Sequence, residues 1–334
     1  MRGRIALATI CVLVLIAAGE TGLNAYLKLG TRLPNGSLAT MHWNAFPIRY
    51  FVTNRDVPGV TAPQLQQAID HALGTWGAVP DVSISTSFGG FTLTPPLTGD
   101  GPTVIGFQDR PELDRVLGAT SFTVDTTNGD ILESDIFLNS SFAWSVAANG
   151  ETGRQDVESI VLHETGHLLG LGHSALGETE LVNGGRRVLG AASIMFPIAF
   201  TAGSLNRVLH PDDTAGLQDI YGNAQFKSST GSITGKITKN GSGVLGAHVV
   251  AFNPATGTMV GGFTSTDDGT YTIGSLAPGT YVLRVEPLDD GDAGSFLSAS
   301  TNIDLNFKPT FATQLATVPR GGTARVVNVQ VQAK

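Results

Sequence analysis

The run from His163 to His173 constrains this chain more than any other stretch. Residues four apart on a helix lie on one face, so His163 and His167 can direct their imidazole nitrogens at one metal ion. Gly170 can adopt the left-handed conformation that ends a helix, which lets His173 reach the same ion from another direction. Neutral imidazole suits Zn²⁺, and three protein ligands leave one position open for water, as in catalytic zinc sites. Glu164 is then placed to accept a proton from that water.

The length and net charge of the chain limit the classes of protein to which it can belong. With 334 residues the chain can form two domains, each with its own core. The net charge is −8, and no basic cluster is longer than Arg186-Arg187. Both observations argue against nucleic acid as a partner.

The N-terminal residues are typical of a secretory signal peptide. Arg2 and Arg4 precede the apolar run 5–18, which ends in small residues, so we assign the signal to residues 1–19. The apolar run is shorter than the ~20 residues that cross a bilayer as a helix. We therefore expect a secreted, extracellular protein without a membrane span, the alternative being an anchor formed by an uncleaved N-terminal segment. The only cysteine, Cys11, lies in this run, so the exported chain would carry no disulfide.

The segments around the histidine run predict a mixed α+β domain over residues 43–222, preceded by a lead-in or short pro-segment at 20–42. Thr61, Pro63 and Gln64 fit a capping box at the start of a helix that ends near Gly77. Alternating or apolar runs predict strands, the last two joined by an Asn-Gly turn, at 46–52, 82–88, 103–107, 118–124 and 131–138.

Two further helices are expected in this domain. One begins at Gln155 or Asp156 and carries His163 and His167. The other begins at His210 and is closed by Gly222.

Two features of this domain have more than one interpretation. Four carboxylates crowd the 118–138 hairpin and could hold Ca²⁺, although turn residues and a solvated edge also explain them; they are Asp125, Asp130, Glu133 and Asp135. A Gly-rich loop at 174–193 contains Arg186 and Arg187. It is interpreted as a surface excursion, or else as a lid, a specificity loop or a site of self-cleavage.

The sequence pattern changes after residue 222. Residues 223–230 are polar and are interpreted as a flexible linker. Residues 231–334 contain short alternating strands separated by turn signals, which is the spacing of an all-β sandwich. This segment has one histidine, His248, and no catalytic constellation, so it is interpreted as a non-catalytic module.

The histidine run with Gly170 resembles that of the metzincin zinc metallopeptidases, and Met195 stands where that clan has its Met-turn. Within the clan, Ser174, the Met195-Phe196-Pro197 stretch and residues 205–222 are similar to the matrixins, the matrix-metalloprotease-like peptidases. The likeness spans residues 43–222. It implies a twisted mixed sheet with three helices, one catalytic Zn²⁺, and protein or peptide substrates that lie extended along residues 118–124.

The chain also departs from the matrixin pattern. No histidine lies between His71 and His163, so the ligands of the matrixin structural zinc are missing. The stretch that walls the main specificity pocket of the family reads Pro197-Ile198-Ala199, without the family's tyrosine. Residues 231–287 resemble a carboxypeptidase regulatory-like (prealbumin-type) β-sandwich, a likeness that implies a fold and leaves open whether the module binds a surface or matrix component.

The sequence therefore favours a secreted zinc metalloendopeptidase in which Glu164 activates a metal-bound water. The alternative is a catalytically silent, zinc-containing protein that binds a cell surface or matrix and displays the sandwich module. A zinc hydrolase with a non-peptide substrate is a third hypothesis.

Overall fold

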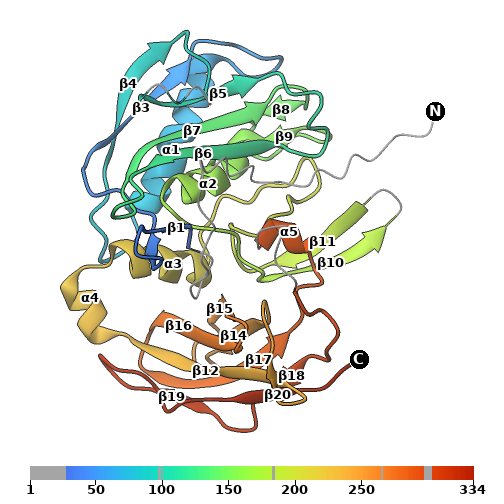
Figure 1. Ribbon diagram of the computed structural model, residues 1–334. Helices are drawn as coiled ribbons and strands as arrows, with labels where there is room; N and C mark the ends of the chain where they lie inside the picture. The colour runs from blue at the N-terminus through green and yellow to red at the C-terminus, as the bar shows by residue number, and fades with distance from the viewer. Residues whose placement is uncertain (1–27, 97–98, 100, 183–184, 265, 297–302) are drawn as a thin grey trace.

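The computed structural model describes residues 28–334 except 97–98, 100, 183–184, 265 and 297–302 (Figure 1). The signal peptide predicted at 1–19 and the start of the predicted lead-in lie outside the described residues. None of the helices in the described part is long and apolar enough to cross a lipid bilayer. Figure 1 shows an N-terminal domain of mixed helices and strands above a C-terminal module of strands.

The strands of the N-terminal domain form one mixed sheet in the order β4-β3-β5-β7-β6. Strands β4, β3, β5 and β7 run parallel, and β6 runs antiparallel to β7 at the edge. The predicted hairpin is confirmed, and Gly129 has the positive φ of +91° that its turn needs. These strands are β3 (Ile48–Thr53), β4 (Thr86–Thr92), β5 (Thr103–Gln108), β6 (Gly118–Val124) and β7 (Ile131–Asn139).

The strand predicted at 82–88 begins later, at Thr86. Asp81 has a φ of +65°, so the chain turns there, and Val82 forms an isolated bridge with Gly222 instead of joining the sheet. The prediction was wrong about the start of this strand because the alternation of residue types begins at Val82, directly after the turn and before the chain joins the sheet at Thr86.

The predicted helices are α1 (Ala62–Gly77), α2 (Val157–Leu168) and α3 (Pro211–Tyr221). The capping box of Thr61 and Gln64 is present. Asp156 is the N-cap of α2 and accepts a hydrogen bond from the Ser159 N–H at 2.9 Å. Helices α1 and α2 pack together, and the indole N–H of the buried Trp76 donates to the Leu162 carbonyl at 2.9 Å.

Residues 28–42 are part of the folded domain. They form a hairpin of β1 (Gly30–Arg32) and β2 (Leu38–Thr40), and the Leu29 N–H donates to the Gly170 carbonyl at 2.8 Å. The sequence showed no periodicity here because strands of three residues are too short to produce one.

The segment predicted as the loop 174–193 instead forms a β-hairpin of β10 (Gly177–Val182) and β11 (Gly185–Ala191). Arg187 lies opposite Glu180 in the register and pairs with it, and Arg186 donates to the Thr179 hydroxyl at 3.0 Å. A short parallel pair, β8 (Trp144–Ser145) and β9 (Gln155–Asp156), precedes α2.

The C-terminal module has the predicted two-sheet arrangement. One sheet has the order β13-β12-β16 with β20 beside β12, and the other has the order β15-β14-β17-β18 with β19 beside β17. The predicted linker contains the short helix α4 (Ala224–Ser229), capped by Asn223. The strands are β12 (Gly231–Lys239), β13 (Ser242–Gly243), β14 (His248–Phe252), β15 (Met259–Phe263), β16 (Thr270–Leu276), β17 (Gly279–Glu286), β18 (Thr310–Phe311), β19 (Ala316–Val318) and β20 (Val329–Val331), with the short helix α5 at Ala293–Phe296.

Candidate metal centre

The three predicted histidines converge at the C-terminal end of α2. His163 and His167 lie on one face of the helix, and Gly170, with a φ of +93°, turns the chain so that His173 approaches from outside it. Their possible ligand atoms all lie within 4.8 Å of one another. Among the described residues, this is the only group of three or more His, Cys, Asp or Glu side chains placed to share one metal ion.

Each imidazole is oriented by a backbone carbonyl. The Nδ1 atom of His163 is 2.7 Å from the Ile194 oxygen, that of His167 is 2.7 Å from the Leu171 oxygen, and that of His173 is 2.5 Å from the Ser295 oxygen. A carbonyl only accepts, so each Nδ1 carries the proton and each Nε2 presents a lone pair in the neutral ring.

The Nε2 atoms have the chemistry of metal ligands. Those of His163 and His167 are 3.0 Å apart with lone pairs facing each other, and Nε2 of His173 is buried with no hydrogen-bond partner among the described residues. Burial lowers the pKa of His163 to about 3 and that of His173 to about 4, and it lowers the pKa of His167 as well. The rings therefore stay neutral at physiological pH, and a shared cation would satisfy the nitrogens that the protein leaves unpaired.

Glu164 lies on α2 opposite the edge strand β6. The Thr120 hydroxyl donates to one carboxylate oxygen, Oε2, at 2.7 Å, and the other oxygen, Oε1, is buried without a partner among the described residues. Burial raises the pKa of Glu164 to about 8, which the Thr120 hydrogen bond opposes. A side chain on Gly118 would lie 3.0 Å from Oε1, so the glycine leaves space beside this oxygen.

Met195 lies against Gly166 of α2, between the first two histidines in sequence, and is almost fully buried. Its position follows from the buried Asp213 carboxylate at the start of α3, which accepts hydrogen bonds from the Ile194 N–H at 2.9 Å, the Met195 N–H at 3.3 Å and the Ser193 hydroxyl. Because the Ile194 carbonyl orients His163, this turn connects α3 to the first histidine.

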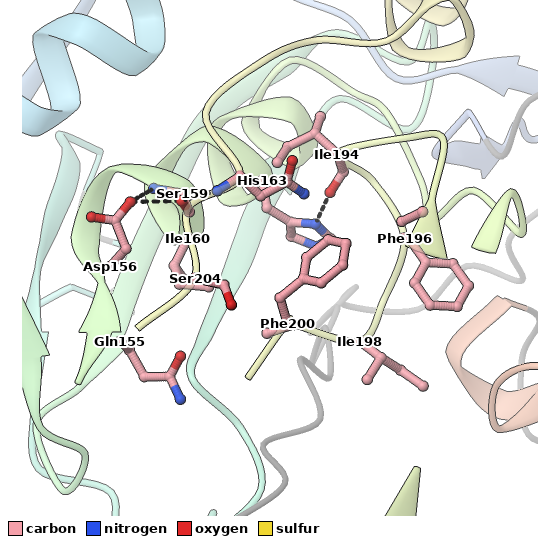
Figure 2. Close-up of a pocket in the computed structure, with 13 residues that line it drawn as sticks. Gln155, Asp156, Ser159, Ile160, His163, Ile194, Phe196, Ile198, Phe200 and Ser204 are labelled. Atoms are coloured by element: carbon pink, nitrogen blue, oxygen red, sulfur yellow. Dashed lines mark hydrogen bonds between the residues drawn. The ribbon is translucent and has the colours of Figure 1, made fainter. Parts of the chain in front are cut away.

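A pocket opens beside His163 (Figure 2). Ile198 and Ala199 of the predicted pocket wall line it, whereas Pro197 is not among its lining residues. Figure 2 shows Phe196 and Ile198 on one side of His163, and Gln155 and Asp156 on the other; the lining residues also include Ile160, Ile194 and Phe200.

The four acidic residues of the hairpin do not come together as a metal-binding group. They accept hydrogen bonds from nearby groups instead. Asp125 accepts from the Thr127 N–H at 2.8 Å, Glu133 from the Thr123 hydroxyl at 3.1 Å, and Asp135 from the Val104 N–H at 2.7 Å. Turn formation accounts for Asp125 and contact between strands for Asp135, whereas the second oxygen of Glu133 is buried without a hydrogen-bond partner among the described residues.

Several residues of the site were not predicted from the sequence. Thr120, Asp213 and Phe200 lie far from the histidines in the chain, and a threonine, an aspartate or a phenylalanine carries no sequence signal of its own. The Ser295 carbonyl belongs to the backbone, so it gives no sequence signal.

Comparisons with known proteins agree with this geometry. The matrixin family model matches residues 42–222, and a carboxypeptidase regulatory-like domain matches residues 232–332. Metalloendoproteinase 2-MMP of Arabidopsis thaliana is 30 % identical over 180 residues, which are 50 % of this chain and 40 % of that protein. Metalloendoproteinase 5-MMP of the same plant is 35 % identical over 95 residues, which are 26 % of this chain and 22 % of that protein.

The fold and the histidine cluster thus define a matrixin-type domain followed by a β-sandwich. Because the matrixin model matches more than half of its residues, the chain belongs to the matrixin family. The matched region spans less than half the length of the plant relatives.

Proposed function

We propose that this protein is a zinc-dependent metalloendopeptidase whose metal is held by His163, His167 and His173. The single observation that carries the proposal is the convergence of three neutral, buried imidazoles next to a carboxylate with a free oxygen. Membership of the matrixin family and the similarity to plant metalloendoproteinases support the same activity.

A zinc ion in this site would supply a Lewis acid that polarises the scissile carbonyl and lowers the pKa of water toward ~7. Glu164 is the proposed general base. Thr120 occupies Oε2, so Oε1 is the oxygen that takes the proton from the attacking water and later delivers it to the leaving amine. The backbone carbonyls behind the imidazoles hold their tautomers, and the buried Met195 packs against Gly166 of the helix that carries His163 and His167.

Removing the metal tests this function directly. We expect the purified protein to contain about one zinc ion per chain and to cleave casein or gelatin. A chelator should abolish cleavage, and added Zn²⁺ should restore it, because the three imidazoles are the proposed ligands. Metal content by atomic absorption and the cleavage rate are measured on the same samples. Full zinc occupancy without cleavage would favour the alternative of a catalytically silent binding protein.

The substrate is proposed to lie extended along the outer edge of β6, the end strand of the sheet. The side chain that follows the scissile bond then enters the pocket beside His163. Because the lining beside His163 includes the apolar side chains of Phe196, Ile198 and Phe200, we propose that the enzyme prefers an apolar residue at that position.

Phe200 offers a test of this pocket. Replacing Phe200 with Ala removes an aromatic ring from the lining and should raise the cleavage of peptides with large side chains relative to small ones by ~10-fold. A peptide library varied at the residue after the scissile bond measures the ratio. Leu205→Ala is the control, since Leu205 is not among the lining residues. An unchanged ratio in Phe200→Ala would remove this pocket from substrate selection.

The proposed site of action is outside the cell, since residues 1–19 have the pattern of a secretory signal. Protein or peptide substrates are the proposed partners, and the C-terminal module is a candidate for binding a surface or matrix component. Calcium stays a prediction: the four hairpin carboxylates do not form a group of three or more side chains that could share an ion, but calcium also takes backbone carbonyl oxygens as ligands.

A further inference from the structure

The C-terminal module reaches the metal centre through the segment 288–296, which we call the clasp. It follows β17 and ends in α5. Figure 1 shows α5 among the elements of the N-terminal domain, beside the β10–β11 hairpin and away from the sheets of its own module. The sequence predicts a non-catalytic module here, because it contains no catalytic constellation.

The decisive contact of the clasp is made by a backbone carbonyl. The Ser295 oxygen lies 2.5 Å from Nδ1 of His173, across 122 residues of sequence. The corresponding carbonyls for His163 and His167 come from the N-terminal domain itself. His173 is therefore the one proposed ligand whose ring is oriented by the C-terminal module.

Other contacts fix the clasp in place. The Asp290 carboxylate accepts a hydrogen bond from the Thr179 N–H at 2.7 Å, and the Asp290 carbonyl accepts one from the Thr179 hydroxyl at 2.9 Å. The buried ring of Phe296 packs against the ring of Phe263 in a tilted arrangement, with 6.1 Å between the two ring centroids. These two rings belong to an apolar cluster that joins the two parts of the chain, together with Ala175, Phe196, Ile198 and Leu288.

A second connection runs through Asp212 at the start of α3. Its carboxylate accepts hydrogen bonds from the hydroxyl of Ser174, the residue after His173, at 2.6 Å, and from the Gly261 N–H of β15 at 2.8 Å. The C-terminal module therefore contacts both the imidazole ring of His173 and, through Asp212, the residue that follows it.

We propose that the clasp is a positioning element of the metal centre, with the Ser295 carbonyl holding the proton of His173 on Nδ1 so that Nε2 is free to bind zinc. The proposal rests on the proposed function of the site. Removing a group that orients a metal-ligating histidine typically weakens metal binding by ~10–100-fold. The C-terminal module is accordingly required for the full zinc affinity of the peptidase.

The test uses the full-length chain. Phe296→Ala loosens the clasp, and we expect it to raise the dissociation constant for Zn²⁺ ~10-fold and to shift the visible absorption bands of the Co²⁺-loaded protein. Val318→Ala, in the core of the module and outside the clasp, is the matched control. It should lower the melting temperature of the module while leaving the Zn²⁺ dissociation constant and the Co²⁺ spectrum unchanged.

A second variant keeps every side chain. An ester bond between residues 295 and 296, introduced with the α-hydroxy analogue of Phe296, makes the Ser295 carbonyl a poorer acceptor and should weaken zinc binding in the same direction. Unchanged Zn²⁺ affinity and Co²⁺ spectra in both variants would overturn the proposal. This failure differs from failure of the proposed function, which would appear as a wild-type protein that binds zinc but cleaves no peptide.

Discussion

Glu164→Gln should keep its zinc and lose peptide-bond cleavage by ~10²–10⁴-fold, the range that general acid–base catalysis supplies. Gln has nearly the same shape, and its amide oxygen can accept the hydrogen bond of Thr120 that now goes to Oε2. The amide cannot take up the proton of the attacking water. Zinc content and the turnover of a fluorogenic peptide, measured on the same preparation, check the two parts of this result.

The matched control for Glu164→Gln is Glu158→Gln. Glu158 lies on the same helix but pairs with Arg207 at 3.3 Å and contacts no proposed ligand. Its variant should cleave at the wild-type rate. Retained turnover in Glu164→Gln would show that another group is the base.

The stability of zinc-free Glu164→Gln relative to zinc-free wild type should depend on pH. Burial raises the pKa of Glu164 from 4.5 to about 8 in the folded state, so the stability contributed by its protonated form is fully present below pH 4.5 and is lost as the pH rises from there to about 8. Gln has no charge to bury. The melting temperature of zinc-free Glu164→Gln relative to zinc-free wild type should therefore increase as the pH rises from 4.5 to about 8 and level off above that.

The positions of the three histidines were predictable because they depend on residues that lie close together in the sequence. The interval between His163 and His167 is one helical turn, and the positive φ of Gly170 is a property that glycine supplies. The capping box at Thr61 and Gln64 was predictable for the same reason, because its hydrogen bonds join residues three apart.

The parts that could not be predicted depend on contacts between distant segments. The carboxylate of Asp213 holds the Met195 turn, and the carbonyl of Ser295 orients His173, but neither pairing leaves a pattern in one sequence. The 174–193 segment looked like a loop because its glycines obscure the alternation of two short strands. The C-terminal module was interpreted as non-catalytic because it lacks catalytic side chains, but its contact with the site is made by a backbone carbonyl, which no side-chain pattern reveals.

Among substitutions that add a single methyl group within the site, Gly166→Ala is expected to disrupt the packing most. Gly166 lies on α2 between the two histidines, and a Cβ there would overlap the sulfur of Met195 and lie 2.8 Å from Cζ2 of Trp76. Both neighbours are buried, so they cannot move aside without repacking the core. Overpacking of this kind costs ~1–3 kcal/mol, which exceeds the ~1 kcal/mol that alanine gains over glycine in a helix.

The displacement should also reach the metal. Met195 follows Ile194, whose carbonyl orients His163, so a shift of the Met195 turn should weaken Zn²⁺ binding by ~10-fold or more. Gly74→Ala is the matched control, because Gly74 lies within helix α1 and a Cβ there meets no atom within 4 Å. It should stabilise the protein by ~0.5–1 kcal/mol and leave zinc affinity unchanged. Chemical denaturation and a competitive zinc titration measure the two effects. A Gly166→Ala protein as stable as Gly74→Ala, with wild-type zinc affinity, would mean that Met195 does not determine the position of His163.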